Sequence, residues 1–329
     1  MKNSTRIKAA LLFTFCFAIS TLMSCEMTET KQEADVAAKP YVAVITKSTT
    51  SEYWKTTFAG VNAASAEYNL KVTMEGPENE EDYVTQNSMI RGAVKNGADA
   101  IVFSAVDYNA NAEVINEAVD KGVKVVVIDS DVNSDKVSCR ISTDNYKAGK
   151  MVGEAVLAGE EELFNVGIVN FDQNSENGQQ REQGFRDAVA EDERVTIVSS
   201  VHVNSTTEEA KDATSAMLKE NPQINIIVTF NEWTSLGVGY AVQEMKLADD
   251  VRVVAFDSNV VSVGMLETGE VDALIVQNPY AMGYLGVEYA WMLINGEKPK
   301  ETEIDTTTTL ITKENMYDPD NQKVLFPFE

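Results

Sequence analysis

From residue 41 onward the chain alternates short β-branched segments with longer segments of helical period, and this alternation constrains its fold more than any other feature. It predicts strands at 41–46, 71–75, 100–104 and 124–129, with helices at 53–68, 80–96 and 109–121. After a strand near 137–142 it predicts a second series, with strands at 165–171, 196–203, 224–230, 251–257 and 271–277 and helices at 146–157, 179–189, 207–219, 235–245 and 260–267. Such alternation is typical of parallel sheets with helices on both faces. The sequence therefore predicts an α/β protein with two consecutive α/β units.

The two predicted units contain an internal sequence repeat. Residues 123–130 read VKVVVIDS and residues 251–258 read VRVVAFDS, so each is a buried strand that ends in Asp-Ser. A repeat of this kind indicates two Rossmann-like lobes of similar topology, with chance similarity between Val-rich strands as the alternative. Ligands bind outside the carboxyl ends of the strands in open parallel sheets. We therefore expect Asp129 and Asp257 at a ligand-binding crevice, one from each lobe.

The N-terminus has the order of a secretory signal peptide. Lys2, Arg6 and Lys8 precede an apolar run at 9–19, and small and polar residues follow. The tetrapeptide 22–25, LMSC, resembles a bacterial lipoprotein signal, which implies acylation of Cys25; the alternative is an accidental cysteine near an ordinary cleavage site. We expect a signal peptide at 1–24, a polar flexible tether at 25–39, and an exported protein that is lipid-anchored in the periplasm or at the cell surface.

Charge and cysteine content exclude several classes of partner and site. Loss of the predicted signal peptide changes the net charge from −25 to −28. This negative charge disfavours binding to nucleic acid, anionic lipid or anionic ligands, unless one local basic pocket outweighs the net charge of the chain. Cys139 is the only cysteine of the predicted folded body, so no intramolecular disulfide is expected there. With His202 as the only histidine, a zinc site is also not expected. The sequence predicts no metal and no cofactor.

Polar residues gather at the predicted strand ends. Asp129, Asn231, Asp257 and Gln277 follow or end strands, and Arg181 lies at a predicted helix start. Carboxylates accept hydrogen bonds from hydroxyl groups, an arginine donates, and amides do both, so the set suits a ring with several hydroxyls. Each residue alone has the alternative of a helix cap or a turn.

Aromatic residues are expected beside the same crevice. Tyr53 and Trp54 follow the first strand, where their rings would stack on the apolar face of a sugar, although at least one of them is expected to be a core residue. Trp233 is a weaker candidate for a wall of the crevice.

These residues resemble a known family, the periplasmic sugar-binding proteins of the type I fold, and in particular ribose-binding-like proteins. The resemblance covers residues 41–311 and is carried by the strand-end pairs 129–130, 231–232 and 256–257, by the segment REQGF at 181–185, and by Gln277. It implies a ligand-binding set of Ser51, Tyr53, Trp54, Asp129, Ser130, Arg181, Asn231, Asp257 and Gln277.

Departures from the family pattern bear on which ligand is bound. Ser130 stands where the family has an arginine and Ser51 where it has an asparagine, and segment 203–206 lacks the aromatic residue that helps to sandwich the ring. We therefore expect a ligand that is not held as ribose is, either a smaller or differently hydroxylated compound or a larger one.

The resemblance also implies the division into lobes. The chain would cross between them three times, near residues 144–145, 277–278 and 307–309. The N-terminal lobe would comprise 40–144 plus 278–307 and the C-terminal lobe 145–277 plus 308–329. Closure about this three-segment hinge would trap the ligand and present the closed form to a membrane partner.

The function that follows is non-catalytic capture of a monosaccharide or similar polyhydroxylated compound by a monomeric protein that delivers it to the permease of an ABC importer. A sensor that presents the closed form to a histidine kinase or chemoreceptor is the main alternative. A carbohydrate-active enzyme is a further one, with Asp129 and Asp257 as its acid and base. The sequence lacks the Gly-rich motifs of nucleotide sites and the Gly-x-Ser-x-Gly elbow of hydrolases, and a signal peptide stands where a DNA-binding domain would be needed.

Overall fold

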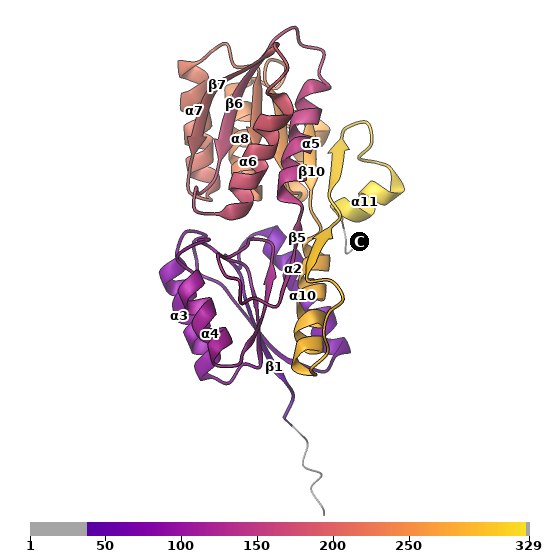
Figure 1. The fold of residues 1–329 in the computed structure, drawn as a ribbon. Helices are drawn as coiled ribbons and strands as arrows, with labels where there is room; N and C mark the ends of the chain where they lie inside the picture. The colour runs from indigo at the N-terminus through magenta and orange to yellow at the C-terminus, as the bar shows by residue number, and fades with distance from the viewer. Residues whose placement is uncertain (1–37, 327–329) are drawn as a thin grey trace, which may run out of the picture. The chain divides into compact units, whose positions relative to one another are not determined.

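The first of the two sheets in the described part of the chain is entirely parallel. The computed structural model describes residues 38–326, and from Lys39 onward the chain forms one compact unit. The strand order of this sheet is β11-β5-β4-β3-β1-β2 (Figure 1). Its strands are β1 (Tyr41–Ile45), β2 (Lys71–Glu75), β3 (Ala100–Phe103), β4 (Lys124–Ile128), β5 (Cys139–Thr143) and β11 (Glu303–Thr306).

The second sheet is parallel except at one edge, and its order is β12-β10-β9-β8-β6-β7. Its strands are β6 (Phe164–Asn170), β7 (Val195–His202), β8 (Ile226–Thr229), β9 (Arg252–Phe256), β10 (Ala273–Val276) and β12 (Thr309–Thr312). The expectation of two α/β units is confirmed, but β12 pairs antiparallel with β10. Only Thr307 and Thr308 separate β12 from β11, which belongs to the other sheet. For β12 to run parallel to β10, a long crossover connection would have been needed in place of these two residues.

Helices cover both faces of each sheet. Figure 1 shows α3 (Tyr83–Lys95) and α4 (Ala112–Asp120) on one face of the first sheet, and α2 (Glu52–Glu67) and α10 (Pro279–Ile294) on the other. The second sheet is covered by α5 (Asn145–Leu157), α6 (Glu176–Val189), α7 (Thr207–Glu220), α8 (Glu232–Met245) and α9 (Val260–Thr268), and α11 (Pro319–Leu325) follows β12. The chain passes between the sheets after β5, after β10 and between β11 and β12; the lobe boundaries given above stay a prediction.

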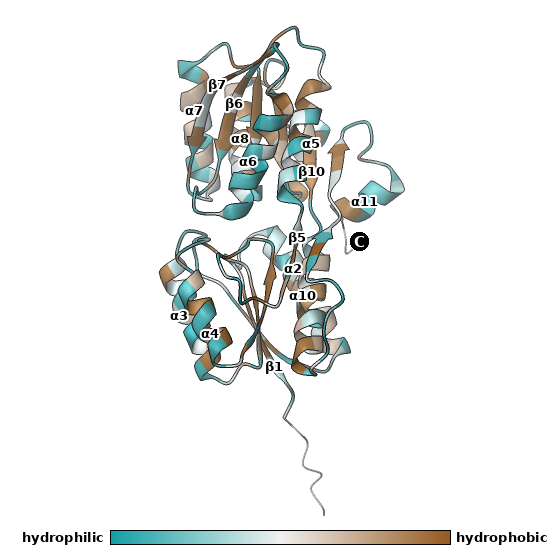
Figure 2. Ribbon diagram, in the orientation of Figure 1, coloured by the Kyte–Doolittle hydropathy of each residue, from teal (hydrophilic) through white to brown (hydrophobic). Residues whose placement is uncertain are grey.

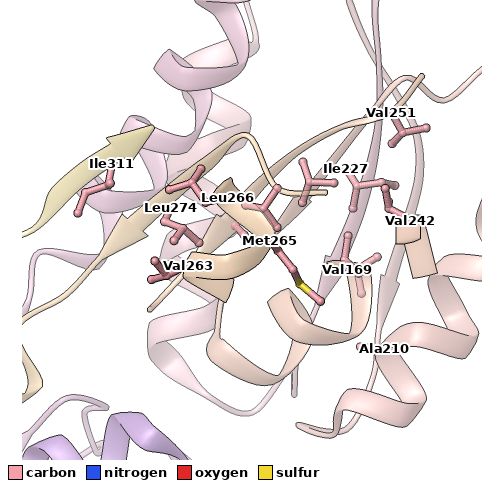
Figure 3. Packing of buried hydrophobic residues seen from close by; sticks show 14 of the residues in the cluster. Val169, Ala210, Ile227, Val242, Val251, Val263, Met265, Leu266, Leu274 and Ile311 are labelled. Atoms are coloured by element: carbon pink, nitrogen blue, oxygen red, sulfur yellow. The ribbon is translucent and has the colours of Figure 1, made fainter. Parts of the chain in front are cut away.

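The packing of the buried core explains why the strands could be recognised from the amino-acid sequence. In β1, Val42 and Val44 join one buried cluster while Ala43 and Ile45 join the cluster on the opposite face, as expected when successive side chains alternate. Both faces need apolar residues, so β3 is apolar throughout and β8 is apolar up to its last residue, Thr229 (Figure 2). Figure 3 shows the same packing in the second sheet, where Leu266 of α9 belongs to one cluster with Leu274 and Ile311.

The helix boundaries differ from the expectations. Helix α6 begins at Glu176, three residues earlier than expected, which places Arg181 in its second turn and not at its start. The polar segment 175–178 looked like a loop, yet Glu176 in the first turn suits the positive end of the helix dipole. Elements α10, β11, β12 and α11 were not among those expected.

The expected lipoprotein signal, with Cys25, lies outside the described residues. Between residues 38 and 326, no helix is both long enough and apolar enough to cross a membrane. Cys139 is buried in β5, as expected for a strand residue, and burial raises the pKa of its thiol.

A close approach of two helices supplies the first prediction. An added Cβ at Gly149 of α5 would lie 2.0 Å from the backbone oxygen of Arg181 in α6, and backbone cannot yield as a flexible side chain does. We expect Gly149→Ala to lower the free energy of unfolding in urea by about 1–3 kcal/mol. Gly264→Ala in α9 is the matched control, since nothing lies within 4 Å of its Cβ, and it should raise stability by about 0.5–1 kcal/mol. Equal effects of the two substitutions would contradict the packing.

Candidate functional site

A polar cleft of about 330 Å³ lies where strands of both sheets end. Eight of the nine sequence-predicted residues line it; Ser130 is the exception. The eight are Ser51, Tyr53, Trp54, Asp129, Arg181, Asn231, Asp257 and Gln277. The fold thus brings together residues separated by more than 200 positions in the chain.

The two aspartates that follow strands share an unusual backbone conformation. Asp129 follows β4 with φ 60° and Asp257 follows β9 with φ 65°, both in the left-handed region. Aspartate tolerates this region better than most residues, though at a cost in energy. Both side chains are buried and line the cleft. The repeated Asp-Ser pattern therefore marks the same strand-end turn in each lobe.

Asp129 is the centre of a hydrogen-bond network. Its carboxylate accepts from the Tyr53 hydroxyl at 2.8 Å, the Ser104 hydroxyl at 2.9 Å and the Asn177 amide at 3.4 Å. Burial, and then the charge of Asp129, raise the pKa of Tyr53 well above its ordinary value. Tyr53 is therefore a neutral hydrogen-bond donor here as well as an aromatic surface.

Arg181 organises the opposite side of the cleft and is only 1% exposed. Its guanidinium donates to Asn145 Oδ1 at 2.8 Å, to the Phe230 carbonyl at 2.8 Å and to Gln277 Oε1 at 2.7 Å. It also lies 4.4 Å from the centroid of the Phe256 ring. These contacts hold the guanidinium in one orientation, so Arg181 has a structural role besides any contact with ligand.

Asp257 is joined to this group through Gln277, whose amide donates to its Oδ1 at 2.7 Å. Burial raises the pKa of Asp257 to about 7, although the positive charge of Arg181 and the bond from Gln277 oppose the shift. A buried acid with a strongly shifted pKa in a cleft is typical of a functional site.

Two predicted ligand residues are also helix caps. The Ser51 hydroxyl accepts from the backbone N–H of Trp54, and the Asn231 side chain forms a capping box with Thr234. The capping alternative therefore holds for both, and both still line the cleft. The Trp54 indole donates to Glu80 at 2.9 Å. Ser130 is fully buried, and among the described residues its hydroxyl has no hydrogen-bond partner.

Five residues that line the cleft were not predicted from the sequence. They are Lys47, Glu80, Phe171, Asn177 and Glu232. Phe171 directly follows β6, so the strand-end criterion would have found it had apolar residues been considered. Its ring also supplies an aromatic surface that segment 203–206 lacks. Glu232 follows Asn231 and accepts from the backbone N–H of Tyr53 at 3.0 Å. No local signal identified Glu80, which lies in a loop after β2.

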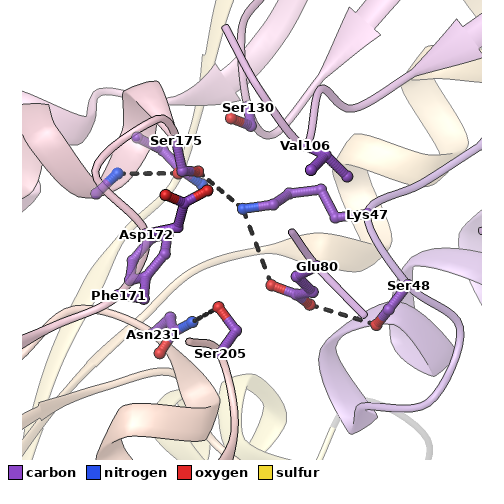
Figure 4. A network of polar contacts seen from close by, with 12 residues as sticks. Lys47, Ser48, Glu80, Val106, Ser130, Phe171, Asp172, Ser175, Ser205 and Asn231 are labelled. Atoms are coloured by element: carbon purple, nitrogen blue, oxygen red, sulfur yellow. Dashed lines mark hydrogen bonds and ion pairs between the residues drawn. The ribbon is translucent and has the colours of Figure 1, made fainter. Parts of the chain in front are cut away.

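Hydrogen bonds join the two sides of the cleft. Lys47 donates to the Ser175 hydroxyl at 2.8 Å, as Figure 4 shows, and the backbone N–H of Ser205 donates to Glu81 at 2.6 Å. Among residues 38–326, no group of three or more His, Cys, Asp or Glu side chains is placed to hold a metal ion.

A second cavity lies beside the cleft and shares Tyr53, Asp257 and Gln277 with it. Its empty volume is about 700 Å³, and α11 contributes Val324 and Leu325 to its wall. It lacks the convergent polar set of the cleft, which remains the better candidate for a hydroxyl-rich ligand.

Comparison with known proteins identifies the family. Residues 42–298 match the model of the periplasmic binding protein domain. This chain belongs to the periplasmic binding protein family. Membership confirms the expected non-catalytic role, and it places this periplasmic binding protein outside the cytoplasm, as expected for an exported chain.

Individual relatives of this periplasmic binding protein cover nearly its whole length. The D-ribose/D-allose-binding protein of Pseudomonas aeruginosa is 28% identical over 94% of this chain and 98% of its own. A carbohydrate transporter solute-binding protein of Agrobacterium radiobacter, solved with D-arabinose, is 30% identical with a TM-score of 0.85, covering 88% of this chain and 99% of its own. An ABC transporter solute-binding protein of Agrobacterium vitis, with bound D-fucose, is 27% identical with a TM-score of 0.84, covering 87% and 99%.

Proposed function

We propose that this protein captures a neutral monosaccharide in the polar cleft and delivers it to an ABC importer. The observation that carries the proposal is a buried polar set in one cleft: Asp129, Asp257 and Gln277 follow strands of the two sheets, and Arg181 comes from α6. Carboxylates, an amide and a guanidinium together offer the acceptors and donors that a ring with several hydroxyls needs.

The charge of the cleft favours a neutral ligand. Within the described residues, two cations line the cleft, Lys47 and Arg181. Four carboxyl groups line it as well, namely Glu80, Asp129, Glu232 and Asp257. Above the pKa of Asp257, which burial raises to about 7, the carboxylates outnumber the cations and would repel a phosphate or carboxylate on the ligand. The net charge of the chain acts in the same direction. Hydroxyl groups are attracted because carboxylates accept strong hydrogen bonds from them.

Aromatic rings around the cleft support a sugar. Tyr53, Trp54, Phe171 and Trp233 line it and offer flat surfaces for the C–H face of a pyranose or furanose. The relatives described above bind or are solved with ribose, allose, arabinose or fucose, which are all neutral sugars. Because Ser51 and Ser130 depart from the ribose-binding pattern, we expect a preference that differs from that for ribose.

A panel of sugars tests the proposal. Purified protein lacking residues 1–25 is melted with D-ribose, D-allose, D-arabinose, D-fucose, inositols and sugar phosphates. A ligand at about 100 times its Kd should add about 2.7 kcal/mol of stability. We expect at least one neutral sugar to raise the Tm and the sugar phosphates to have no effect. Stabilisation by phosphates alone, or by none of the sugars, would contradict the proposal.

We further propose that the protein is a monomer anchored to the membrane by a lipid on Cys25. The sequence 22–25 and the polar segment that follows support this anchor. Cys25→Ser should move the exported protein from the membrane fraction to the soluble fraction, because acylation requires the thiol. Immunoblots of cell fractions would measure this. Cys139→Ser is the control and should stay with the membrane; if the Cys25 variant also stays there, the anchor is not at this residue.

A further inference from the structure

The second cavity, beside the cleft, lies where the chain passes between the two sheets, and we call it the hinge cavity. Gln277 and Asn278 of one crossing line it, and so does Thr307 of another. Its empty volume is about 700 Å³, compared with about 330 Å³ for the cleft. Gln277 and Asp257 line both spaces and are joined by a hydrogen bond of 2.7 Å. The hinge cavity is therefore a neighbouring space behind a hydrogen-bonded wall, and not an extension of the cleft.

The walls of the hinge cavity come from elements that pack on different sheets. Thr56 of α2 forms part of one wall. Helix α2 lies tightly against α10, because an added Cβ at Gly283 would be 2.1 Å from the backbone oxygen of Thr57. Val324 and Leu325 of α11 form the facing wall and pack on the core of the second sheet. A rotation of one sheet relative to the other would separate these walls, so the shape of the cavity depends on the arrangement of the lobes.

The lining of the hinge cavity combines hydroxyl groups with apolar surface. Thr56, Ser258 and Thr309 come from α2, from the turn after β9 and from β12. All three are half-buried, and their hydroxyls form no hydrogen bond within the described part of the chain. Val276 and Leu325 add apolar contact area. Each hydroxyl can donate and accept, so the cavity suits a molecule with an apolar body and a few hydroxyl groups.

Charge favours a neutral molecule in the hinge cavity. Among the described residues that line it, Asp257 and Lys323 are ionisable. The Asp257 carboxyl group accepts from Gln277, and the Lys323 ammonium pairs with Asp320 at 2.8 Å on an exposed side chain. Both groups already have partners, so neither is placed to neutralise a charge inside the cavity. Burial of an ionic group without a partner is costly, and this cost disfavours a charged occupant.

Hydrogen bonds across the cleft show that the lobes are in contact in this structure. The backbone N–H of Tyr53 donates to Glu232 at 3.0 Å, and that of Ser205 donates to Glu81 at 2.6 Å. The hinge cavity described here therefore accompanies the closed arrangement. A molecule that fits it binds this arrangement better than one with separated lobes, and the same holds for a ligand enclosed in the cleft. Each of the two bound molecules then raises the affinity for the other.

We propose that the hinge cavity is a second binding site, which takes a small neutral ring compound with one or two hydroxyl groups and strengthens sugar binding in the cleft. The ring packs between α2 and α11, and its hydroxyl bonds to the unpartnered side chains of Thr56, Ser258 or Thr309. The site itself goes beyond the proposed function. Only its coupling to sugar rests on that function.

Phenol and cyclohexanol are the probes, and benzoate is the charged comparison. Their binding to wild type is titrated by saturation-transfer NMR, without sugar and with a saturating amount of the sugar that binds most tightly in the panel above. We expect both alcohols to bind, and benzoate to bind at least about 10-fold more weakly. Saturating sugar should raise the affinity for each alcohol by at least about 5-fold. By reciprocity, saturating alcohol should lower the calorimetric Kd for sugar by the same factor.

Two substitutions locate the probes in the hinge cavity. Val324→Trp fills the cavity from α11, so we expect alcohol affinity to fall at least about 10-fold and sugar affinity to stop responding to alcohol. Thr309→Val keeps the shape but removes one hydroxyl, which should weaken alcohol binding about 3- to 10-fold. Val260→Trp in α9 is the matched control, since Val260 is 77% exposed and lines neither space. It should bind both alcohols as wild type does.

The outcomes separate the second site from the proposed function. If neither alcohol binds wild type, or if Val324→Trp binds both as wild type does, the proposal is overturned. Displacement of the alcohols by sugar would place them in the cleft, with the same consequence, and tighter binding of benzoate would overturn the neutral class. If Val324→Trp does not fold by circular dichroism, unchanged alcohol binding by Thr309→Val overturns the site.

The coupling to sugar is judged separately. Independent binding of sugar and alcohol, with no mutual effect, overturns the coupling. If no sugar of the panel binds wild type but the alcohols bind it and not Val324→Trp, the proposed function fails while the second site stands.

Discussion

Asp257→Asn is expected to weaken sugar binding by at least about 100-fold while the unliganded protein stays as stable as wild type or becomes more stable. The carboxylate offers two charged acceptors to ligand hydroxyls, and each such bond contributes about 1.5–3 kcal/mol. Asparagine keeps one acceptor for Gln277 but presents an N–H₂ group in place of the other. Asparagine also tolerates the left-handed backbone at φ 65°, which alanine would not, so the change tests chemistry and not strain.

Through Asp257, a rise in pH is expected to lower the stability of the unliganded protein and to raise its affinity for sugar. Burial raises the pKa of Asp257 from 3.8 to about 7, so between these values the folded protein holds a proton that the unfolded chain has released. The resulting stabilisation is complete below pH 3.8 and is lost as the pH rises through 7. Unliganded wild type should therefore become less stable from pH 5 to pH 8. Sugar affinity should rise over the same range, because the ionised carboxylate is the better acceptor.

Comparison of Asp257→Asn with wild type isolates this contribution. Urea unfolding at several pH values should show a shallower decline for the variant. Some slope should remain, since burial also raises the pKa of Glu176 to about 7. A variant that binds sugar normally, or whose stability follows pH as wild type does, would contradict the assignment of Asp257.

Arg181→Ala is expected to destabilise the protein strongly as well as to abolish binding. The guanidinium supplies donors to Asn145, Phe230 and Gln277 in a fully buried setting. Its removal leaves three buried acceptors without that donor. Each lost hydrogen bond costs about 1–3 kcal/mol of folding free energy before the surrounding structure relaxes. We expect the midpoint of urea unfolding to fall markedly, and sugar to restore little of the loss.

The exposed Arg194, which pairs with Asp192 in the same lobe, is the matched control. Arg194→Ala should change the unfolding midpoint little, because exposed ion pairs contribute little to stability. If Arg181→Ala unfolds at the wild-type midpoint, the hydrogen bonds of its guanidinium do not support the fold, and the residue would serve the ligand alone.

Much of the fold could be predicted because its signals are local. A strand buried on both faces needs apolar residues at every position, and Val42 to Ile45 show this pattern directly. The ends of such strands are also local features, which is why Asp129, Asp257 and Gln277 could be named from the sequence; all three line the cleft, and their contact with ligand stays a prediction. The boundaries of α6 and the antiparallel β12 were not predicted, because a polar first turn resembles a loop and the direction of an edge strand depends on the chain path.

The site as a whole required the tertiary structure. Ser130 belongs to the same strand-end pair as Asp129, yet it does not line the cleft, because the direction of a side chain depends on the backbone turn around it. Lys47 and Glu80 meet only because two loops of the first sheet converge, and Lys47 reaches Ser175 only because the second sheet lies opposite. The amino-acid pattern determined which strands form and where they end, since burial acts on each strand separately. Which of the flanking residues share one cleft was decided by how two sheets pack, since that depends on contacts between residues far apart in the chain.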